Sequence, residues 1–112
     1  MLLALALFAA MSPDAHAPFP KRARHCQWVR GRFAVANGSS INRLYVSKTK
    51  HALALYDGDE RVPPAIRRYW NDQPLKHSLW GDFYVCARER YIPGHMQHVR
   101  ILGTRRTVIA GY

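Results

Sequence analysis

The chain has 112 residues, of which 48% are apolar and 21% are charged, and this composition is typical of a folded protein with one small domain. It excludes disordered, collagen-like and coiled-coil proteins, and the length excludes an enzyme of several domains. Lys and Arg number 17 against seven Asp and Glu, so the formal net charge is +10 and anionic partners are favoured.

The N-terminus has the pattern of an export signal. Residues 2–10 are nine apolar residues without a charge, and this run is shorter than the ~20 residues of a membrane-spanning helix. Ala15 and Ala17 supply the small residues of a cleavage site. We therefore predict a signal peptide over residues 1–17 and a periplasmic or secreted protein. The alternative is a cytosolic protein with a frayed apolar N-terminus. Residues 18–25 are basic, contain proline and show no periodicity, so they are expected to form a flexible lead.

Three strands are predicted in the first half of the chain. Apolar and polar residues alternate over residues 27–36, and Gly31 within this run indicates a bulge or bend. Asn-Gly at 37–38 is typical of a hairpin turn. Residues 41–46 and 51–56 follow as the second and third strands.

The period changes after the third strand. Pro64 suits the first position of a helix, and Ile66, Tyr69 and Trp70 then share one helical face. Two further strands are expected, over residues 83–87 and over residues 96–102. Residues 79–81 form an extended segment that leads into the first of them. Residues 106–110 are expected to form either a short sixth strand or the end of the fifth.

This order predicts a mostly β fold, a small antiparallel barrel or sandwich of five to six strands with one short helix between strands three and four. An OB-type barrel has a long bent first strand and a helix in this position, so it is the favoured topology. A sandwich of two sheets is the alternative. We expect one domain over residues 26–112.

Cys26 and Cys86 are the only cysteines of the chain. An even number behind an export signal predicts a disulfide, which would join neighbouring strands of an OB-type barrel. Closing a loop of this length stabilises a fold by up to ~4 kcal/mol. Buried free thiols and a reactive thiol are the alternatives, although no C-x-x-C motif is present.

No residue pattern indicates catalysis, a cofactor or a metal. His95 and His98 are three residues apart across a turn and a strand start, where their side chains face opposite sides. No set of nucleophile, base and orienting residue is visible, so we expect a protein that is not an enzyme.

Aromatic and basic residues form the one sizeable candidate site. Trp28, Arg30 and Arg32 lie on one face of the first strand, and Arg43 and Tyr45 share a face of the second. Arginine forks and aromatic rings suit phosphate, carboxylate and stacked bases, so these five residues are a candidate anion-binding face. The alternative places Trp28 in the core and leaves the arginines scattered in solvent.

The chain also carries three spaced motifs: Cys26-x4-Gly31-Arg32, Gly81-Asp82-Phe83-x-Val85-Cys86 and Pro93-Gly94-x-Met96-Gln97. This frame spans roughly residues 26–101. It resembles a family of short, uncharacterised exported bacterial proteins, mainly alphaproteobacterial. The resemblance implies export and paired cysteines and implies no activity. Lys48 and Ala54 stand where members of that family carry glycines.

Together these patterns predict an exported, non-catalytic β domain that acts as an interaction module of the cell envelope and binds another protein. The alternative is a basic module for a polyanion, either a nucleic acid or an anionic surface polymer. An exposed apolar patch would favour the first function, and a continuous stripe of arginines and aromatic rings would favour the second.

Overall fold

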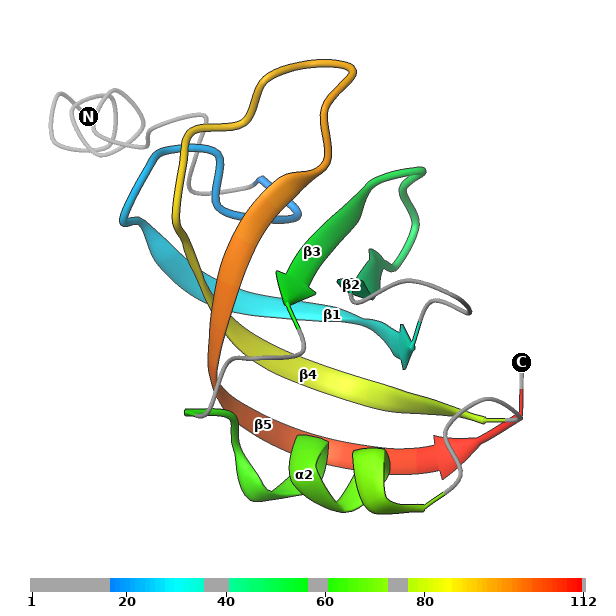
Figure 1. The fold of residues 1–112 in the computed structure, drawn as a ribbon. Coiled ribbons are helices and arrows are strands. Elements are labelled where there is room, and N and C mark those ends of the chain that lie inside the picture. Colours follow the sequence, from blue (N-terminus) through cyan, green and yellow to red (C-terminus); the bar gives the residue numbers. More distant parts are fainter. Residues whose placement is uncertain (1–16, 36–40, 57–60, 73–76, 112) are drawn as a thin grey trace, which may run out of the picture.

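The computed structural model describes residues 17–35, 41–56, 61–72 and 77–111 (Figure 1). The chain is mostly β with one short helix between the third and fourth strands, as predicted. The predicted run at 106–110 is the end of the long fifth strand. The elements are β1 (Cys26–Val35), β2 (Ile41–Val46), β3 (Ala52–Tyr56), α2 (Pro64–Asn71), β4 (Ser78–Ala87) and β5 (Gln97–Ala110).

The strands close into a barrel in the order β1-β2-β3-β5-β4. This order, with the helix between β3 and β4, is that of an OB-type barrel and not of a sandwich. Four neighbouring pairs are antiparallel, but β3 and β5 are parallel, with Leu53 opposite Gln97 and Ala54 opposite His98. The expected antiparallel barrel is therefore a mixed one. The reason is that β5 reaches β3 only after α2 and β4, and such a crossover permits parallel pairing.

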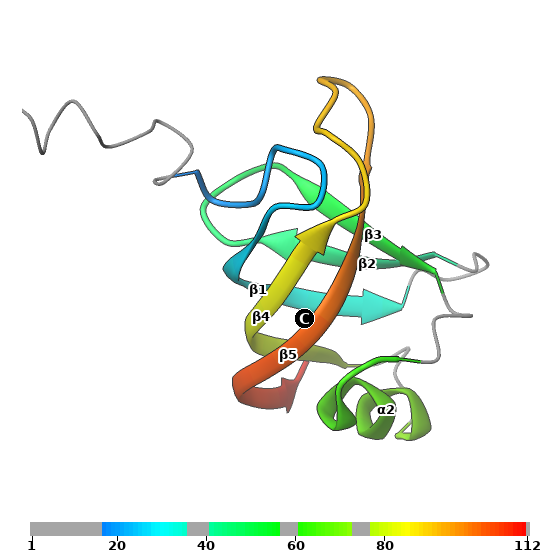
Figure 2. The same cartoon turned by 90° about the vertical axis from the view of Figure 1, so that its left-hand side faces the viewer.

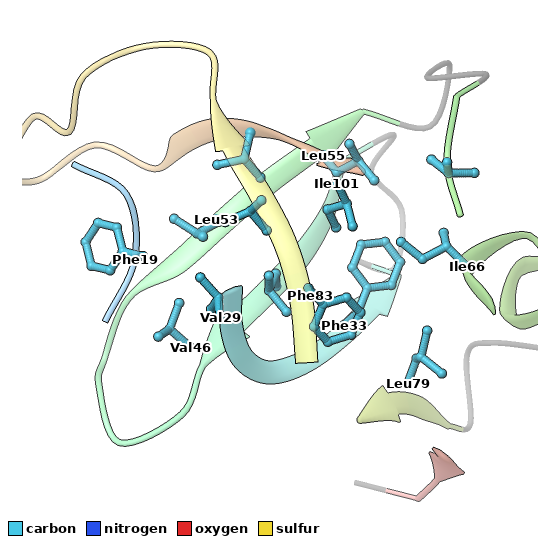
Figure 3. Packing of buried hydrophobic residues seen from close by; sticks show 14 of the residues in the cluster. Phe19, Val29, Phe33, Val46, Leu53, Leu55, Ile66, Leu79, Phe83 and Ile101 are labelled. Carbon is cyan, nitrogen blue, oxygen red and sulfur yellow. The ribbon is translucent and has the colours of Figure 1, made fainter. Parts of the chain in front are cut away.

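The core forms where alternate strand residues point into the barrel. Phe33 from β1 lies against Tyr69 of α2 and Phe83 of β4, with ring centroids 5.9 and 6.1 Å apart, respectively. Figure 3 shows Phe19 at one end of this cluster and Ile66 at the other. The alternation that predicted the strands thus also separates core positions from outward-facing ones.

Gly31, where the sequence indicates a bulge or bend, lies where β1 passes between two partner strands. Gly31 lies opposite Val46 of β2 and Gly81 of β4 in the two ladders. A Cβ atom at position 31 would overlap the carbonyl oxygen of Tyr45. Only glycine therefore allows the backbones of β1 and β2 to approach this closely.

The helix begins where the two prolines predict it. Pro63 precedes the first turn and Pro64 is its first residue. Ile66 and Tyr69 are buried, and the indole N–H of Trp70 donates a hydrogen bond of 3.3 Å to the side-chain oxygen of Asn42. No helix in the described ranges is long and apolar enough to cross a membrane.

Two turn positions adopt the left-handed backbone region that favours glycine. Lys48 has φ 62° in the turn between β2 and β3. Arg24 has φ 65° just before β1. In both cases a charged residue adopts a backbone conformation that is energetically unfavourable for residues other than glycine.

Residues 18–25, predicted to be a flexible lead, contact the barrel in the structure. Phe19 is fully buried, and its ring contacts those of His51 and Tyr91, with centroids 4.9 and 5.3 Å away. The amide of Tyr91 donates to the carbonyl of Lys21, and the side chain of Gln27 donates to the carbonyl of Ala17, both at 2.8 Å. The sequence does not reveal this because a single buried aromatic residue has no periodicity.

Cys26 and Cys86 form the predicted disulfide. They lie directly opposite each other in the β1–β4 ladder, with Cα atoms 4.0 Å apart. The bond therefore joins neighbouring strands of the barrel near one end of each.

Candidate functional site

The outer face of the barrel carries a band of aromatic and charged side chains. It runs across β1, β4 and β5, which lie next to one another on one side of the molecule (Figure 2). Their registers align outward-facing residues in rows, and Tyr45 of β2 extends one row. We call this band the stripe: Trp28, Arg30, Arg32, Tyr45, Trp80, Asp82, Tyr84 and Arg105.

The first row is aromatic. Trp28 lies opposite Tyr84, with ring centroids 5.3 Å apart, and Tyr84 lies opposite Gly103 of β5. Trp28 keeps 39% of its surface exposed. The alternative that buries Trp28 in the core is therefore wrong, because Val29 and not Trp28 points into the barrel.

The second row is charged. Asp82 accepts hydrogen bonds from Arg30 at 3.1 Å and from Arg105 at 3.2 Å, one on each carboxylate oxygen. The Asp82 side chain is only 8% exposed, whereas both arginines are largely open to solvent. The guanidinium of Arg105 also stacks on the ring of Trp28, 4.1 Å from its centroid. This arrangement links the charged row to the aromatic row.

The third row combines a cation with two rings. Arg32 lies opposite Trp80 in one ladder and Tyr45 in the other. Its guanidinium carbon is 4.3 Å from the ring centroid of Tyr45 and 5.8 Å from that of Trp80. The same guanidinium donates to the hydroxyl of Ser78 at 3.1 Å. Arg32 is thus held in place by the rings on both sides.

The structure therefore brings together four of the five residues that the sequence proposes. The exception is Arg43, which lies opposite Ala34 and Ala54, beyond Tyr45 along β2, and makes none of the described contacts of the stripe. Its Nε is buried without a hydrogen-bond partner among the described residues.

Sequence reasoning missed the half of the stripe that comes from β4 and β5. Trp80, Asp82 and Tyr84 alternate along β4 just as Trp28, Arg30 and Arg32 do along β1. That alternation is visible in the sequence and could have indicated an outward face. Only the register, however, shows that these residues lie beside those of β1.

The stripe suits anionic and planar ligand groups. A guanidinium stacked on a ring leaves its N–H edges open to an oxyanion, and an exposed indole offers a face for stacking. The stripe contains three arginines and a single carboxylate, so it carries two net positive charges.

Outside the stripe, Glu89 and His98 form a hydrogen-bonded pair. Glu89 accepts hydrogen bonds from the backbone amide of His98 at 3.1 Å and from its ring nitrogen at 2.7 Å. The backbone hydrogen bond first, and then that from the ring, hold the pKa of Glu89 below its ordinary value. Within the described part of the chain, no three His, Cys, Asp or Glu side chains gather as metal ligands would.

No family model, curated protein or solved structure matches this chain. The resemblance to exported bacterial proteins, and with it the export signal, therefore stays a prediction.

Proposed function

We propose that this protein is a binding module for an anionic polymer, which it holds along the stripe. The observation that carries the proposal is the unbroken alternation of rings and guanidinium groups across β1, β4 and β5. The guanidinium carbon of Arg105 lies about 4 Å from the ring centroid of Trp28, and that of Arg32 lies equally close to the ring centroid of Tyr45. Both cations are therefore ordered before a ligand arrives. Preordered side chains lose less conformational freedom on binding.

The dimensions of the stripe favour a polymer over a small anion. Successive rows are two residues apart, which corresponds to about 7 Å along a strand, and the aromatic rows at Trp28 and Trp80 are about 13 Å apart. Repeating groups of one chain can therefore occupy several rows at once. The net charge of +10 adds long-range attraction for such a ligand.

Titration with heparin and with a single-stranded oligonucleotide tests the proposal, with indole fluorescence as the signal. Affinity should fall steeply as salt rises, because each phosphate or sulfate contact releases counterions. The variant Arg32→Gln/Arg105→Gln leaves Arg30 paired with Asp82 and should weaken binding about tenfold. The control Arg68→Gln/Arg90→Gln removes the same charge from exposed positions outside the stripe.

A third variant changes the charge in the opposite direction. Asp82→Asn removes the carboxylate that Arg30 and Arg105 share, so it should strengthen binding at low salt. Equal losses in the stripe and control variants would show that the binding is unspecific attraction to a basic surface. Absence of binding to either polymer at low salt would reject the proposal.

A protein-binding module is the second candidate, and one observation favours it. Val108 is 59% exposed and lies opposite Trp80, which is 37% exposed, so two apolar side chains adjoin at one end of the stripe. Exposed apolar groups that adjoin are typical of protein interfaces. A photoreactive residue at position 108 should crosslink one partner in the producing cells, and the same residue at exposed position 68 should not.

A further inference from the structure

A second group of arginines lines a hollow on the same side of the barrel. The hollow has a volume of about 420 Å³. Its lining residues are Arg24, Cys86, Ala87, Arg88 and Arg100. No carboxylate is among these described lining residues. A hollow with three guanidinium-bearing side chains is suited to an oxyanion.

The fold assembles this hollow from three separate segments. The amide of Arg24, in its left-handed conformation, donates a 2.7 Å hydrogen bond to the carbonyl of Ala87, so the turn before β1 is fixed against the end of β4. Arg100 of β5 lies directly opposite Cys86. The disulfide from Cys86 to Cys26 then ties this end of β4 to the start of β1.

The hollow continues the stripe. Cys86 is two residues beyond Tyr84 on β4, and both face outward because strand residues alternate. The order along the barrel is therefore hollow, aromatic row at Trp28, charged row at Asp82, and aromatic row at Trp80. The two cationic positions are four residues apart along β4, about 13 Å, with a ring platform between them.

This order fits one class of polymer better than others. A single-stranded nucleic acid alternates phosphates with flat bases, and base stacking on aromatic side chains is a common mode of binding single strands. A sulfated polysaccharide carries its charges on puckered rings that lack a π face. The exposed indoles of Trp28 and Trp80 therefore favour the nucleic acid.

We propose that the polyanion of the proposed function is a single-stranded nucleic acid, with one phosphate held in the hollow of Arg24, Arg88 and Arg100 and a base stacked on Trp28. This proposal depends on the proposed function of the stripe. It adds a binding subsite that lies outside the stripe and names the class of ligand.

Fluorescence anisotropy with a labelled oligothymidylate of about 12 nucleotides tests both parts, since single-strand sites on OB folds cover ~4–16 nucleotides. The variant Arg24→Gln/Arg100→Gln should weaken binding about tenfold. It should also reduce the slope of log affinity against log salt by about 0.7, the contribution of the one phosphate contact that the hollow makes on a single strand. The control Arg68→Gln/Arg90→Gln should change both the affinity and the salt slope by less.

Trp28 distinguishes the two polymers. Trp28→Ala should weaken oligothymidylate binding about tenfold and heparin binding clearly less, because heparin loses only the ordering of Arg105 by the ring. Trp28→Phe should restore most of the loss. Urea unfolding of each variant shows whether it is folded. If the glutamine pair does not fold, Arg24→Lys/Arg100→Lys keeps the charge, loses the guanidinium forks and should bind several-fold more weakly.

The outcomes separate this inference from the proposed function. If the hollow variants bind oligothymidylate like the control while the stripe variant is weak, the hollow is not a subsite and the proposed function stands. If Trp28→Ala weakens heparin and oligothymidylate equally, the ligand is not specifically a nucleic acid. If the unmodified protein binds neither polymer, both proposals fail.

Discussion

Replacing Phe19 by alanine is expected to destabilise the fold strongly, although the sequence places this residue outside the domain. Its side chain is fully buried and contacts the rings of His51 and Tyr91. Truncating a buried phenylalanine to alanine costs ~3–5 kcal/mol, from the lost transfer free energy and the cavity that remains. A domain of this size has a total stability of roughly 5–15 kcal/mol. The loss is therefore a large fraction of the whole.

Urea unfolding followed by tryptophan fluorescence and by circular dichroism measures this loss. For a domain of roughly 100 residues each kcal/mol corresponds to about 4–8 °C, so in a thermal melt the melting temperature should fall by about 12–40 °C. Phe19→Leu keeps an apolar group in the site and should cost less than ~1.5 kcal/mol. Ala23→Gln changes an exposed residue of the same segment and should stay within ~0.5 kcal/mol.

The refuting result is a Phe19→Ala variant within ~1 kcal/mol of the unmodified protein. Residues 17–25 would then contribute little to the core, and the ring contacts around Phe19 would not be stable in solution. A loss in Phe19→Ala equal to that in Ala23→Gln would lead to the same conclusion.

Three further predictions concern the barrel itself. Replacing Cys26 and Cys86 by serine should lower the free energy of unfolding by up to ~4 kcal/mol in urea titrations, and two titratable thiols in the unreduced native protein would contradict the bond. Gly31→Ala forces a Cβ into a β2 carbonyl oxygen and should cost ~1–3 kcal/mol in the same assay, whereas an unchanged unfolding midpoint would show that β1 and β2 can separate there. The pKa of Glu89 is lowered in the folded state by its hydrogen bonds from His98, so the contribution of this pair is present above the unfolded pKa and is lost as pH falls through the folded one. Carboxyl-carbon NMR should show this lowered pKa in the unmodified protein. In His98→Ala the pKa should be nearer its ordinary value but still lowered, because the backbone hydrogen bond, the larger cause, remains. Identical values would assign the whole shift to the backbone.

Local chain geometry explains what could be predicted from the sequence. Side chains of a strand alternate between two faces, so the sequence is sufficient to place Trp28, Arg30 and Arg32 on one face of β1. The structure shows that this face points outward. Proline fixes its own φ, and this makes Pro64 a reliable start for α2. Two cysteines allow one intramolecular pair, so the disulfide between Cys26 and Cys86 required no knowledge of the fold.

The tertiary structure alone decided which segments meet. Register and strand order depend on contacts between residues far apart in the chain, and local periodicity does not record them. Asp82 lies 52 residues after Arg30 and 23 before Arg105, yet it joins the two into one charged row. The burial of Phe19 likewise depends on partners from other strands and loops. The alternation of β1 therefore determined that a polar face exists, whereas pairing with β4 and β5 determined that this face is a continuous stripe of rings and cations.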